Sequence, residues 1–258
     1  MLCGKYIKNS SGTLPKLQDE SDQPEQNKMI SFQVVRSVGV GSTGKVYLCR
    51  QADSPAQKFV LKKITANLEV QALRSLGKHD QIVSLQGIID KQYMALEWIP
   101  GLELFDMINQ GELKTSTIST IFWLLVDTLE YIHTRGWVHG DIKPENIMVM
   151  ESEIGELTIK LIDFGMSRSA SNACKGIWGS LEYAPPEMLR DEHYDPIKAE
   201  MWSVGVVLHT MVHRCFPCDF KNNECPNSAS AHDIIIADLL NPDPLKRPTC
   251  SELKNKYA

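Results

Sequence analysis

The sequence lacks any stretch long and apolar enough to cross a membrane as a helix. A spanning helix needs roughly 18–20 consecutive apolar residues, whereas the most apolar stretch, residues 202–212, is interrupted by Ser203, His209 and Thr210. The first residues also contain no apolar run of signal-peptide length. We therefore expect no membrane span, and we interpret residues 202–212 as a helix buried in a protein core.

An excess of positive charge is also absent. The net charge is −5 and the sequence pI is about 5.8, which argues against a nucleic-acid partner because such a partner needs a basic face. The seven cysteines are odd in number and scattered, which indicates a reducing environment rather than a disulfide framework. We expect an intracellular, cytoplasmic protein, with access to the nucleus left open.

One pair of cysteines has the spacing of metal ligands. Cys215 and Cys218 lie close to His213 and Cys225, and a structural zinc site needs four converging ligands. The intervening residues 216–217, Phe-Pro, fit a loop after a buried helix better. A zinc site is therefore the less favoured interpretation.

Composition divides the chain into a tail and one larger region. Residues 1–29 are polar and offer few groups that could join a core, so they are expected to be a disordered tail. From Ile30 onward apolar residues recur in strand-like and helix-like patterns. We expect a single folded region over residues 30–258, and we find no internal repeat.

The chemistry-bearing motif is residues 139–146, with the sequence His-Gly-Asp-Ile-Lys-Pro-Glu-Asn. It follows an expected helix over about residues 117–135, capped by Thr115 or Ser116, and it precedes Asp-Phe-Gly at residues 163–165. The apolar positions of that helix recur at helical spacing and are expected to be core residues: Ile118, Ile121, Phe122, Leu125, Leu129 and Ile132. The two motifs at this spacing are highly specific together, and the chain resembles the eukaryotic protein kinase family.

This resemblance implies roles for the motif residues. Asp141 would accept or orient the hydroxyl that receives the phosphoryl group, and Lys143 would place a positive charge beside it. Asn146 and Asp163 would hold Mg²⁺ through hard oxygen ligands. The implied cofactors are ATP and Mg²⁺.

A glycine-rich stretch favours the same family. Residues 38–46 are expected to form strand, turn and strand, and the implied nucleotide contacts there are Val38, Gly39, Val40, Gly41, Ser42, Thr43, Gly44, Lys45 and Val46. A dinucleotide-binding fingerprint would place a helix directly after the glycines, but a third strand with Lys62 follows instead. By resemblance Lys62 neutralises phosphate charge and Glu69 is its counter-ion. Only six residues separate the two, so the helix carrying Glu69 must be short or begin abruptly.

The resemblance also implies the fold and the adenine site. We expect an α+β, two-lobed protein-kinase-like fold, with a β-rich N-lobe over residues 30–98 and a helical C-lobe over residues 99–258. Residues 82–85 and 93–98 are expected strands of the N-lobe, and the second leads into the connector between lobes. The implied contacts with adenine or ribose are Val46, Val60, Glu97 (backbone), Ile99 (backbone), Glu103 and Met148.

Several positions depart from the family pattern. Gly140 replaces the Arg that commonly precedes the catalytic Asp and pairs with a phosphate on the activation segment. We therefore hypothesise activity that does not need phosphorylation of Ser167, Ser169 or Ser171. Gly140 and the short Lys62–Glu69 separation are also similar to the NF-κB-inducing kinase branch.

Other departures concern the pocket and the anchors of the loops. Val60 is larger than the usual Ala, and Thr43 replaces an aromatic residue at the glycine-loop tip. Glu200 replaces the Asp that usually anchors the catalytic loop. By resemblance, Glu187 of the Pro-Pro-Glu motif pairs with Arg247.

We expect a monomeric serine/threonine protein kinase. By resemblance to the family, Lys143 implies Ser or Thr acceptors and Met166 implies a preference for Ser. Glu103 with Glu145 likewise implies a mild preference for a basic residue upstream. One alternative is a pseudokinase that serves as a binding or scaffold module, which Val60 and Thr43 favour. Another is a small-molecule kinase similar to aminoglycoside and choline kinases.

Overall fold

The structure is a computed structural model that describes residues 17–18, 32–41, 44–52, 54, 56–190, 192–217 and 231–258. Two compact units are present. The first comprises Met1–Val70 and Ser84–Trp98, and the second comprises Gln71–Val83 and Ile99–Ala258. The glycine-loop residues Ser42 and Thr43 and the cysteines Cys218 and Cys225 lie outside the described residues.

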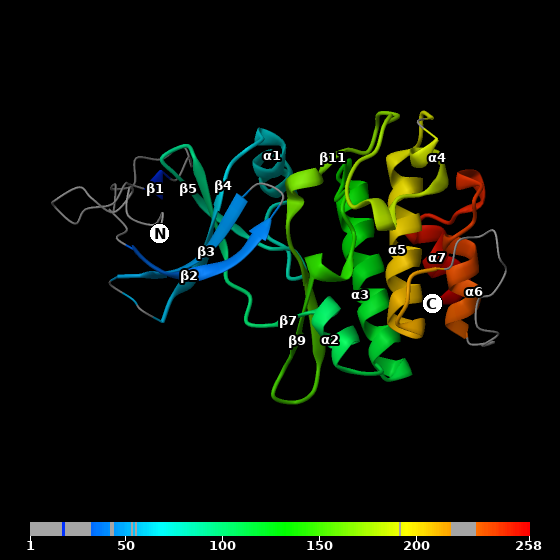
Figure 1. Cartoon of the computed structure of the whole chain (residues 1–258), viewed down its shortest axis with the longest axis horizontal. Helices are drawn as coiled ribbons and strands as arrows, with labels where there is room; N and C mark the ends of the chain where they lie inside the picture. Colours follow the sequence, from blue (N-terminus) through cyan, green and yellow to red (C-terminus); the bar gives the residue numbers. More distant parts are fainter. Residues whose placement is uncertain are drawn as a thin grey trace. The chain divides into compact units, whose positions relative to one another are not determined.

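A six-stranded antiparallel sheet forms most of the first unit (Figure 1). Its order is β1-β5-β6-β4-β3-β2. The strands are β1 (Leu17–Gln18), β2 (Phe32–Gly41), β3 (Gly44–Gln51), β4 (Lys58–Lys63), β5 (Leu85–Ile89) and β6 (Tyr93–Glu97). β1 is the only described part of the predicted tail and pairs with β5; the disorder predicted for the rest stays a prediction.

Successive side chains along each strand point to opposite faces of the sheet, and one of these faces is buried. Cys49, Phe59, Leu61, Ile89 and Ala95 form the buried cluster on this face. The intervening residues point to the opposite face, which carries Val60 and Lys62. Val60 and Lys62, both predicted to meet ATP, therefore lie on the face that does not form this core.

The helix α1 (Asn67–Leu76) follows β4, and the chain after it differs from the prediction. The strand expected at residues 82–85 begins only at Leu85, so that prediction was wrong in its bounds. Ile82 instead forms a bridge with Leu161, and the Val83 N–H donates to the Leu161 carbonyl at 3.0 Å. These bonds tie Ile82 and Val83 to the second unit, to which residues 71–83, assigned by us to the N-lobe, belong.

The second unit is mainly helical. Its helices are α2 (Leu104–Gln110), α3 (Thr115–Thr134), α4 (Pro186–Leu189), α5 (Pro196–His213), α6 (Ala231–Leu239) and α7 (Cys250–Tyr257). Its strands are β7 (Leu102–Glu103), β8 (Trp137–Val138), β9 (Ile147–Glu151), β10 (Leu157–Leu161) and β11 (Arg168–Ser169). The α+β, two-lobed fold class is thus confirmed.

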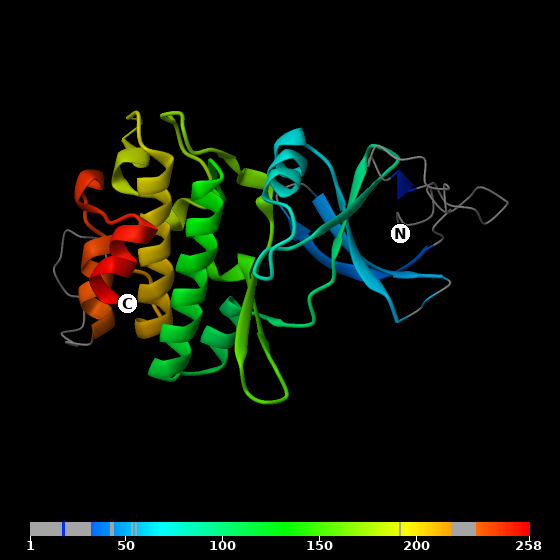
Figure 2. The same cartoon turned by 180° about the vertical axis from the view of Figure 1, so that it is seen from behind.

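The core of this unit lies between α3 and α5, which run side by side in both views (Figures 1 and 2). All six apolar positions predicted on α3 are buried, and residues 202–212 form the buried helix predicted for them. The start of α3 differs from the prediction. The helix begins at Thr115 after Lys114, whose side chain makes no capping hydrogen bond, so neither Thr115 nor Ser116 is the cap.

Among the helices that the structure describes, none has the length and apolar character that crossing a membrane requires.

Candidate active site

Lys62 lies on β4, and a carboxylate from α1 holds its ammonium group. Nζ of Lys62 lies 2.7 Å from Oε1 of Glu69, and both side chains are buried. Glu69 stands in the first turn of α1, so the helix begins abruptly after β4. The predicted ion pair is present, while its action on a nucleotide phosphate stays a prediction.

The remaining first-unit candidates lie around this pair on the same sheet. Val46 on β3 is paired with Lys62, and Val60 stands two residues before Lys62 on β4. The described glycine-loop candidates occupy the facing ends of β2 and β3: Val38, Gly39, Val40, Gly41, Gly44, Lys45 and Val46. Gly44 has φ +115°, a conformation that L side chains rarely adopt. At the end of β6, Oε2 of Glu97 accepts from the Ser84 N–H at 3.1 Å.

The second unit holds the predicted catalytic loop, where hydrogen bonds converge on Asp141. Lys143 Nζ lies 2.9 Å from Oδ2 of Asp141 and donates to Oγ of Ser180 at 2.8 Å. The Ser180 N–H donates to Oδ1 of Asp141 at 2.8 Å. Nδ2 of Asn146 donates to the Asp141 carbonyl at 2.8 Å and to Oδ2 at 3.1 Å. The structure thus brings Lys143 and Asn146 each into direct contact with Asp141.

The ionisation of Asp141 follows from these contacts. Burial alone would raise the pKa of the carboxyl group, but hydrogen bonds from Lys143 and Ser180 hold that pKa below its ordinary value. Asp141 is therefore a carboxylate at neutral pH. A carboxylate has more acceptor sites than these donors occupy, so it can also accept a bond from a hydroxyl.

His139 fixes the backbone on either side of this carboxylate. Its Nε2 donates to the Ile162 carbonyl at 2.9 Å, and its Nδ1 accepts from the Asp141 N–H at 3.3 Å. A carbonyl can only accept and an amide N–H can only donate, so the two bonds assign a neutral ring protonated at Nε2. The ring also packs edge-on against buried Phe164, with centroids 4.7 Å apart.

Asn146 and Asp163 lie at the same end of the β9–β10 hairpin. Ile147 pairs with Leu161, and the Ile162 N–H donates to the Asn146 carbonyl at 2.9 Å. Asp163 has a left-handed backbone, φ +60°, and its Oδ1 accepts from the Gly165 N–H at 3.2 Å. The backbone positions that carry these two oxygen-bearing side chains therefore lie close together.

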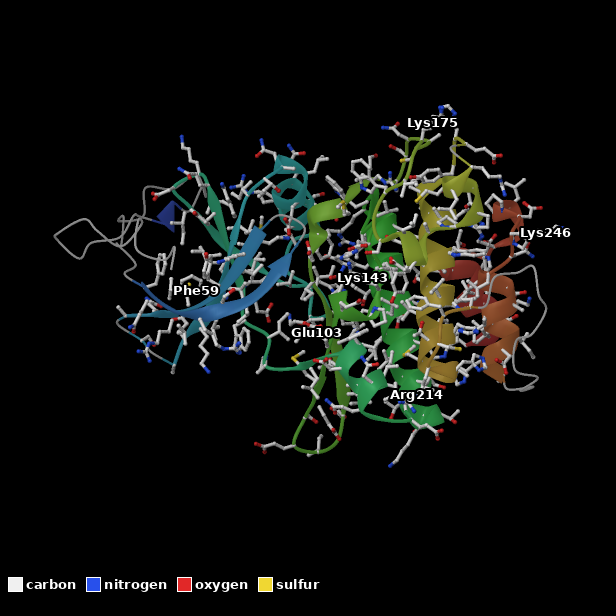
Figure 3. The ribbon with its side chains drawn as sticks, in the orientation of Figure 1. Phe59, Glu103, Lys143, Lys175, Arg214 and Lys246 are labelled. Atoms are coloured by element: carbon white, nitrogen blue, oxygen red, sulfur yellow. The ribbon has the colours of Figure 1, made fainter. Side chains whose placement is uncertain are left out.

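Three further candidates, Ile99, Glu103 and Met148, lie in the second unit. Ile99 is buried, and Glu103 on β7 pairs with Met148 on β9. Burial, followed by the charges of Asp106 and Glu145, raises the pKa of Glu103. Figure 3 labels Glu103 and Lys143, which both belong to this unit. Contacts of these three residues with a nucleotide stay predictions.

Buried carboxylates anchor the loops that carry these groups. Oε1 of Glu200 accepts from the Gly140 N–H at 2.7 Å, and Oε2 lies 2.6 Å from Nε2 of His133. Glu187 forms the predicted pair with Arg247 through two bonds of 2.6 and 2.7 Å. Glu200, whose side chain is one methylene longer than that of Asp, thus contacts both the catalytic loop at Gly140 and helix α3 at His133.

Sequence reasoning missed a second set of contacts in this unit. The indole N–H of Trp178 donates to the Met166 carbonyl at 2.9 Å, and Arg168 donates to the hydroxyl of Tyr194 at 3.0 Å. These bonds depend on the path of an irregular segment, for which neither helical nor strand periodicity gives a signal. The one sequence feature that could have indicated these contacts was the large aromatic side chain of Trp178, two residues before Ser180.

Known proteins are similar to the chain along most of its length. Residues 32–257 match the protein kinase domain family. CBL-interacting protein kinase 26 of Oryza sativa subsp. japonica is 32% identical over 257 residues, which cover 88% of this chain and 51% of that protein. CBL-interacting serine/threonine-protein kinase 20 of Arabidopsis thaliana is 30% identical over 251 residues, covering 85% of this chain and 56% of that protein.

A fungal relative is similar to the same extent. The carbon catabolite-derepressing protein kinase of Candida glabrata is 31% identical over 233 residues, covering 84% of this chain and 36% of that protein. The chain spans about half the length of the first of these curated relatives. Because the domain match covers most of the sequence and agrees with the fold, the chain belongs to the protein kinase family.

Proposed function

We propose that this chain is an ATP- and Mg²⁺-dependent serine/threonine protein kinase that phosphorylates a hydroxyl of a protein substrate. The observation that carries the proposal is the arrangement around Asp141. Lys143 contacts both the Asp141 carboxylate and the hydroxyl of Ser180. This fixes a hydrogen-bond acceptor and a positive charge side by side, as phosphoryl transfer to an alcohol requires.

Asp141 is the group that meets the acceptor hydroxyl. Its lowered pKa keeps it ionised near neutral pH, so it accepts the hydroxyl hydrogen and orients the oxygen. Lys143 stabilises the negative charge that develops beside that oxygen. In the first unit, Glu69 holds the Lys62 ammonium group, which would neutralise the charge of a nucleotide phosphate.

The chain's own donor atoms fit a magnesium nucleotide. Mg²⁺ prefers hard oxygen ligands, often one or two carboxylates together with phosphate oxygens. The amide nitrogen of Asn146 donates to the Asp141 carbonyl, so the amide oxygen of Asn146 points away from Asp141. Asp163 adds a carboxylate at the same end of the β9–β10 hairpin. When bound, ATP with Mg²⁺ supplies the transferable phosphoryl group, and Asn146 and Asp163 would hold the metal.

The acidic residues near Glu103 support a mild preference for a basic substrate residue. Within the described part of the chain, Oε2 of Glu145 is buried without a hydrogen-bond partner. Burial is the largest cause of the raised pKa of Glu103, and the charges of Asp106 and Glu145 raise it further, so an approaching cation would relieve the repulsion among these acids. We expect serine peptides with an upstream Arg to exceed matched Leu peptides in kcat/KM by a few-fold, and Glu145→Gln to reduce that ratio. Equal ratios in both proteins would contradict this part of the proposal.

The central test is transfer of label from γ-labelled ATP in the presence of Mg²⁺. Purified protein is given casein and serine peptides, and in parallel aminoglycoside and choline as small alcohols. Lys62→Met and Asp141→Asn are expected to abolish labelling of peptide serine. Lys63→Met is the matched control, because Lys63 is the next residue on β4 and is exposed.

Each alternative function predicts a different result. Label on the small alcohols alone would indicate a small-molecule kinase. Nucleotide binding without transfer to any acceptor would indicate a pseudokinase that serves as a binding module. Transfer that survives Asp141→Asn would show that the chemistry lies elsewhere.

We also propose an intracellular location. Among the described cysteines, Cys49, Cys174 and Cys250 are free thiols, which agrees with a reducing compartment. Detection of a disulfide in protein alkylated at once on cell lysis would contradict this.

A further inference from the structure

The segment between Met166 and Glu187 is fixed at several points by uncharged contacts. The backbones of Cys174 and Tyr194 exchange two hydrogen bonds, each of 2.9 Å. The Tyr194 hydroxyl donates to the Gly176 carbonyl at 3.2 Å, and Ser203 donates to the Tyr183 carbonyl at 2.9 Å. The path of the segment is therefore set along much of its length without a phosphate group.

Trp178 makes the contact that ties the middle of the segment to its beginning. Its indole N–H donates to the Met166 carbonyl at 2.9 Å, and its backbone N–H contacts Sδ of Met188 at 3.3 Å. Gly179 and Ser180 follow directly, and Ser180 is the residue that contacts Asp141 and Lys143. A displacement of Trp178 would move Ser180 away from the catalytic carboxylate.

Arg168 joins Trp178 to Tyr194, and we name these three residues the Trp178 cluster. The Arg168 guanidinium carbon lies 5.1 Å from the Trp178 ring centroid and 5.4 Å from the Tyr194 ring centroid. Such cation–π contacts stabilise a desolvated guanidinium. Nη2 is bonded to Tyr194 and Nε is buried, so Arg168 does not present these two donors to a phosphate on the segment.

Gly140 accommodates this arrangement. It has φ +81°, and an added Cβ would overlap the Met166 backbone oxygen, the atom that accepts from Trp178. A side chain at position 140 would therefore displace the carbonyl on which Trp178 depends. An Arg side chain at position 140 would therefore conflict with the hydrogen bond from the Trp178 indole to the Met166 carbonyl.

We propose that Trp178 is a positioning residue that holds Ser180 against Asp141 and Lys143, and so makes activity independent of phosphorylation of the segment. The proposal rests on the proposed kinase function. It adds to that function a residue, Trp178, that fixes the position of Ser180 beside the catalytic carboxylate. The hydroxyl side chains between Met166 and Trp178 are Ser167, Ser169 and Ser171. Ser167 is buried and donates to the His139 carbonyl at 3.2 Å, which leaves Ser169 and Ser171 as candidate phosphorylation sites.

The test compares Trp178→Phe and Trp178→Ala with Ile177→Ala. Phe retains an aromatic ring for Arg168 but lacks the N–H donor, whereas Ala lacks both. Ile177 is the adjacent residue and is 56% exposed, which makes it the matched control. Measurements are kcat, KM for ATP, thermal unfolding and amide hydrogen exchange across residues 174–183.

Loss of one hydrogen bond is expected to lower kcat of Trp178→Phe by about two- to tenfold. Loss of the ring contact as well should give Trp178→Ala a further several-fold loss, about 10- to 100-fold in total. KM for ATP and the melting temperature should change little, while the Ser180 amide should exchange faster. Ile177→Ala should match the unaltered protein in all four measurements.

Phosphatase treatment and the double variant Ser169→Ala, Ser171→Ala form the second arm. Both should leave kcat unchanged; loss of turnover in either would overturn the proposal. Unchanged kcat and exchange in Trp178→Ala would overturn it as well. If the unaltered protein transfers no phosphoryl group, the kinase function fails, and hydrogen exchange still reports whether Trp178 holds the segment.

Discussion

Replacing Gly140 by alanine tests the geometry beside the catalytic carboxylate most sharply, because the chain contains a matched glycine. Gly140 and Gly136 have nearly equal backbone angles, φ +81° and +77°. Both would incur the cost of placing an L residue in a left-handed conformation, about 1–2 kcal/mol. This shared cost cancels when the two variants are compared.

The two sites differ in what the new Cβ meets. At Gly136 no atom lies within 4 Å, whereas at Gly140 the Cβ would overlap the Met166 backbone oxygen. Overpacking typically costs about 1–3 kcal/mol. We therefore expect Gly140→Ala to lower the free energy of unfolding by about 1–3 kcal/mol more than Gly136→Ala does.

Urea unfolding of both variants measures this difference, and kcat measured on the same preparations reports the effect on the site. Gly140→Ala should also lose turnover, because the displaced carbonyl is the acceptor for Trp178. Gly136→Ala should retain it. Equal losses of stability at the two positions, within about 0.5 kcal/mol, would refute the argument from close approach.

Further predictions concern the ion pairs and one histidine. Glu187→Gln leaves the buried Arg247 guanidinium without its carboxylate, so urea unfolding should show a loss of about 3–5 kcal/mol; a loss below about 1 kcal/mol would contradict this. Glu69→Gln should reduce kcat/KM for ATP by about tenfold or more with the fold intact, because Lys62 loses its counter-ion; an unchanged value would argue against the pair. Burial lowers the pKa of His209, so the unfolded chain binds more protons below the ordinary histidine pKa of about 6.5. Stability should therefore fall as pH drops through this region, and His209→Asn should flatten the dependence; a steeper dependence in the variant would contradict it.

Resemblance to the protein kinase family allowed the catalytic loop to be predicted from the sequence, and its local character explains why the contacts agree. Asp141, Lys143 and Asn146 lie within one short loop, so their contacts follow from a turn of the chain, and the structure contains those contacts. Lys62 and Glu69 are separated by a few residues across a strand–helix junction, and their pair was also predicted. In both cases sequence proximity limits the possible arrangements.

Contacts set by the path of irregular backbone could not be predicted in this way. The bond from Trp178 to the Met166 carbonyl depends on how a segment without regular structure returns to its beginning. The misplaced strand has a related cause, because the β-favouring residues near Ile82 do not reveal that their partner is Leu161 on a distant hairpin. At α3, propensity favoured Thr115 or Ser116 as a cap, but the helix begins at Thr115 after Lys114, whose side chain makes no capping hydrogen bond.

The most direct test of the whole account is transfer of the γ-phosphoryl group of ATP to peptide serine. The account predicts phosphoserine formation by the unaltered protein with Mg²⁺, at a turnover on the order of 1–100 s⁻¹, and none by Asp141→Asn. Phosphoserine formed equally well by Asp141→Asn, or none formed by the unaltered protein, would contradict it.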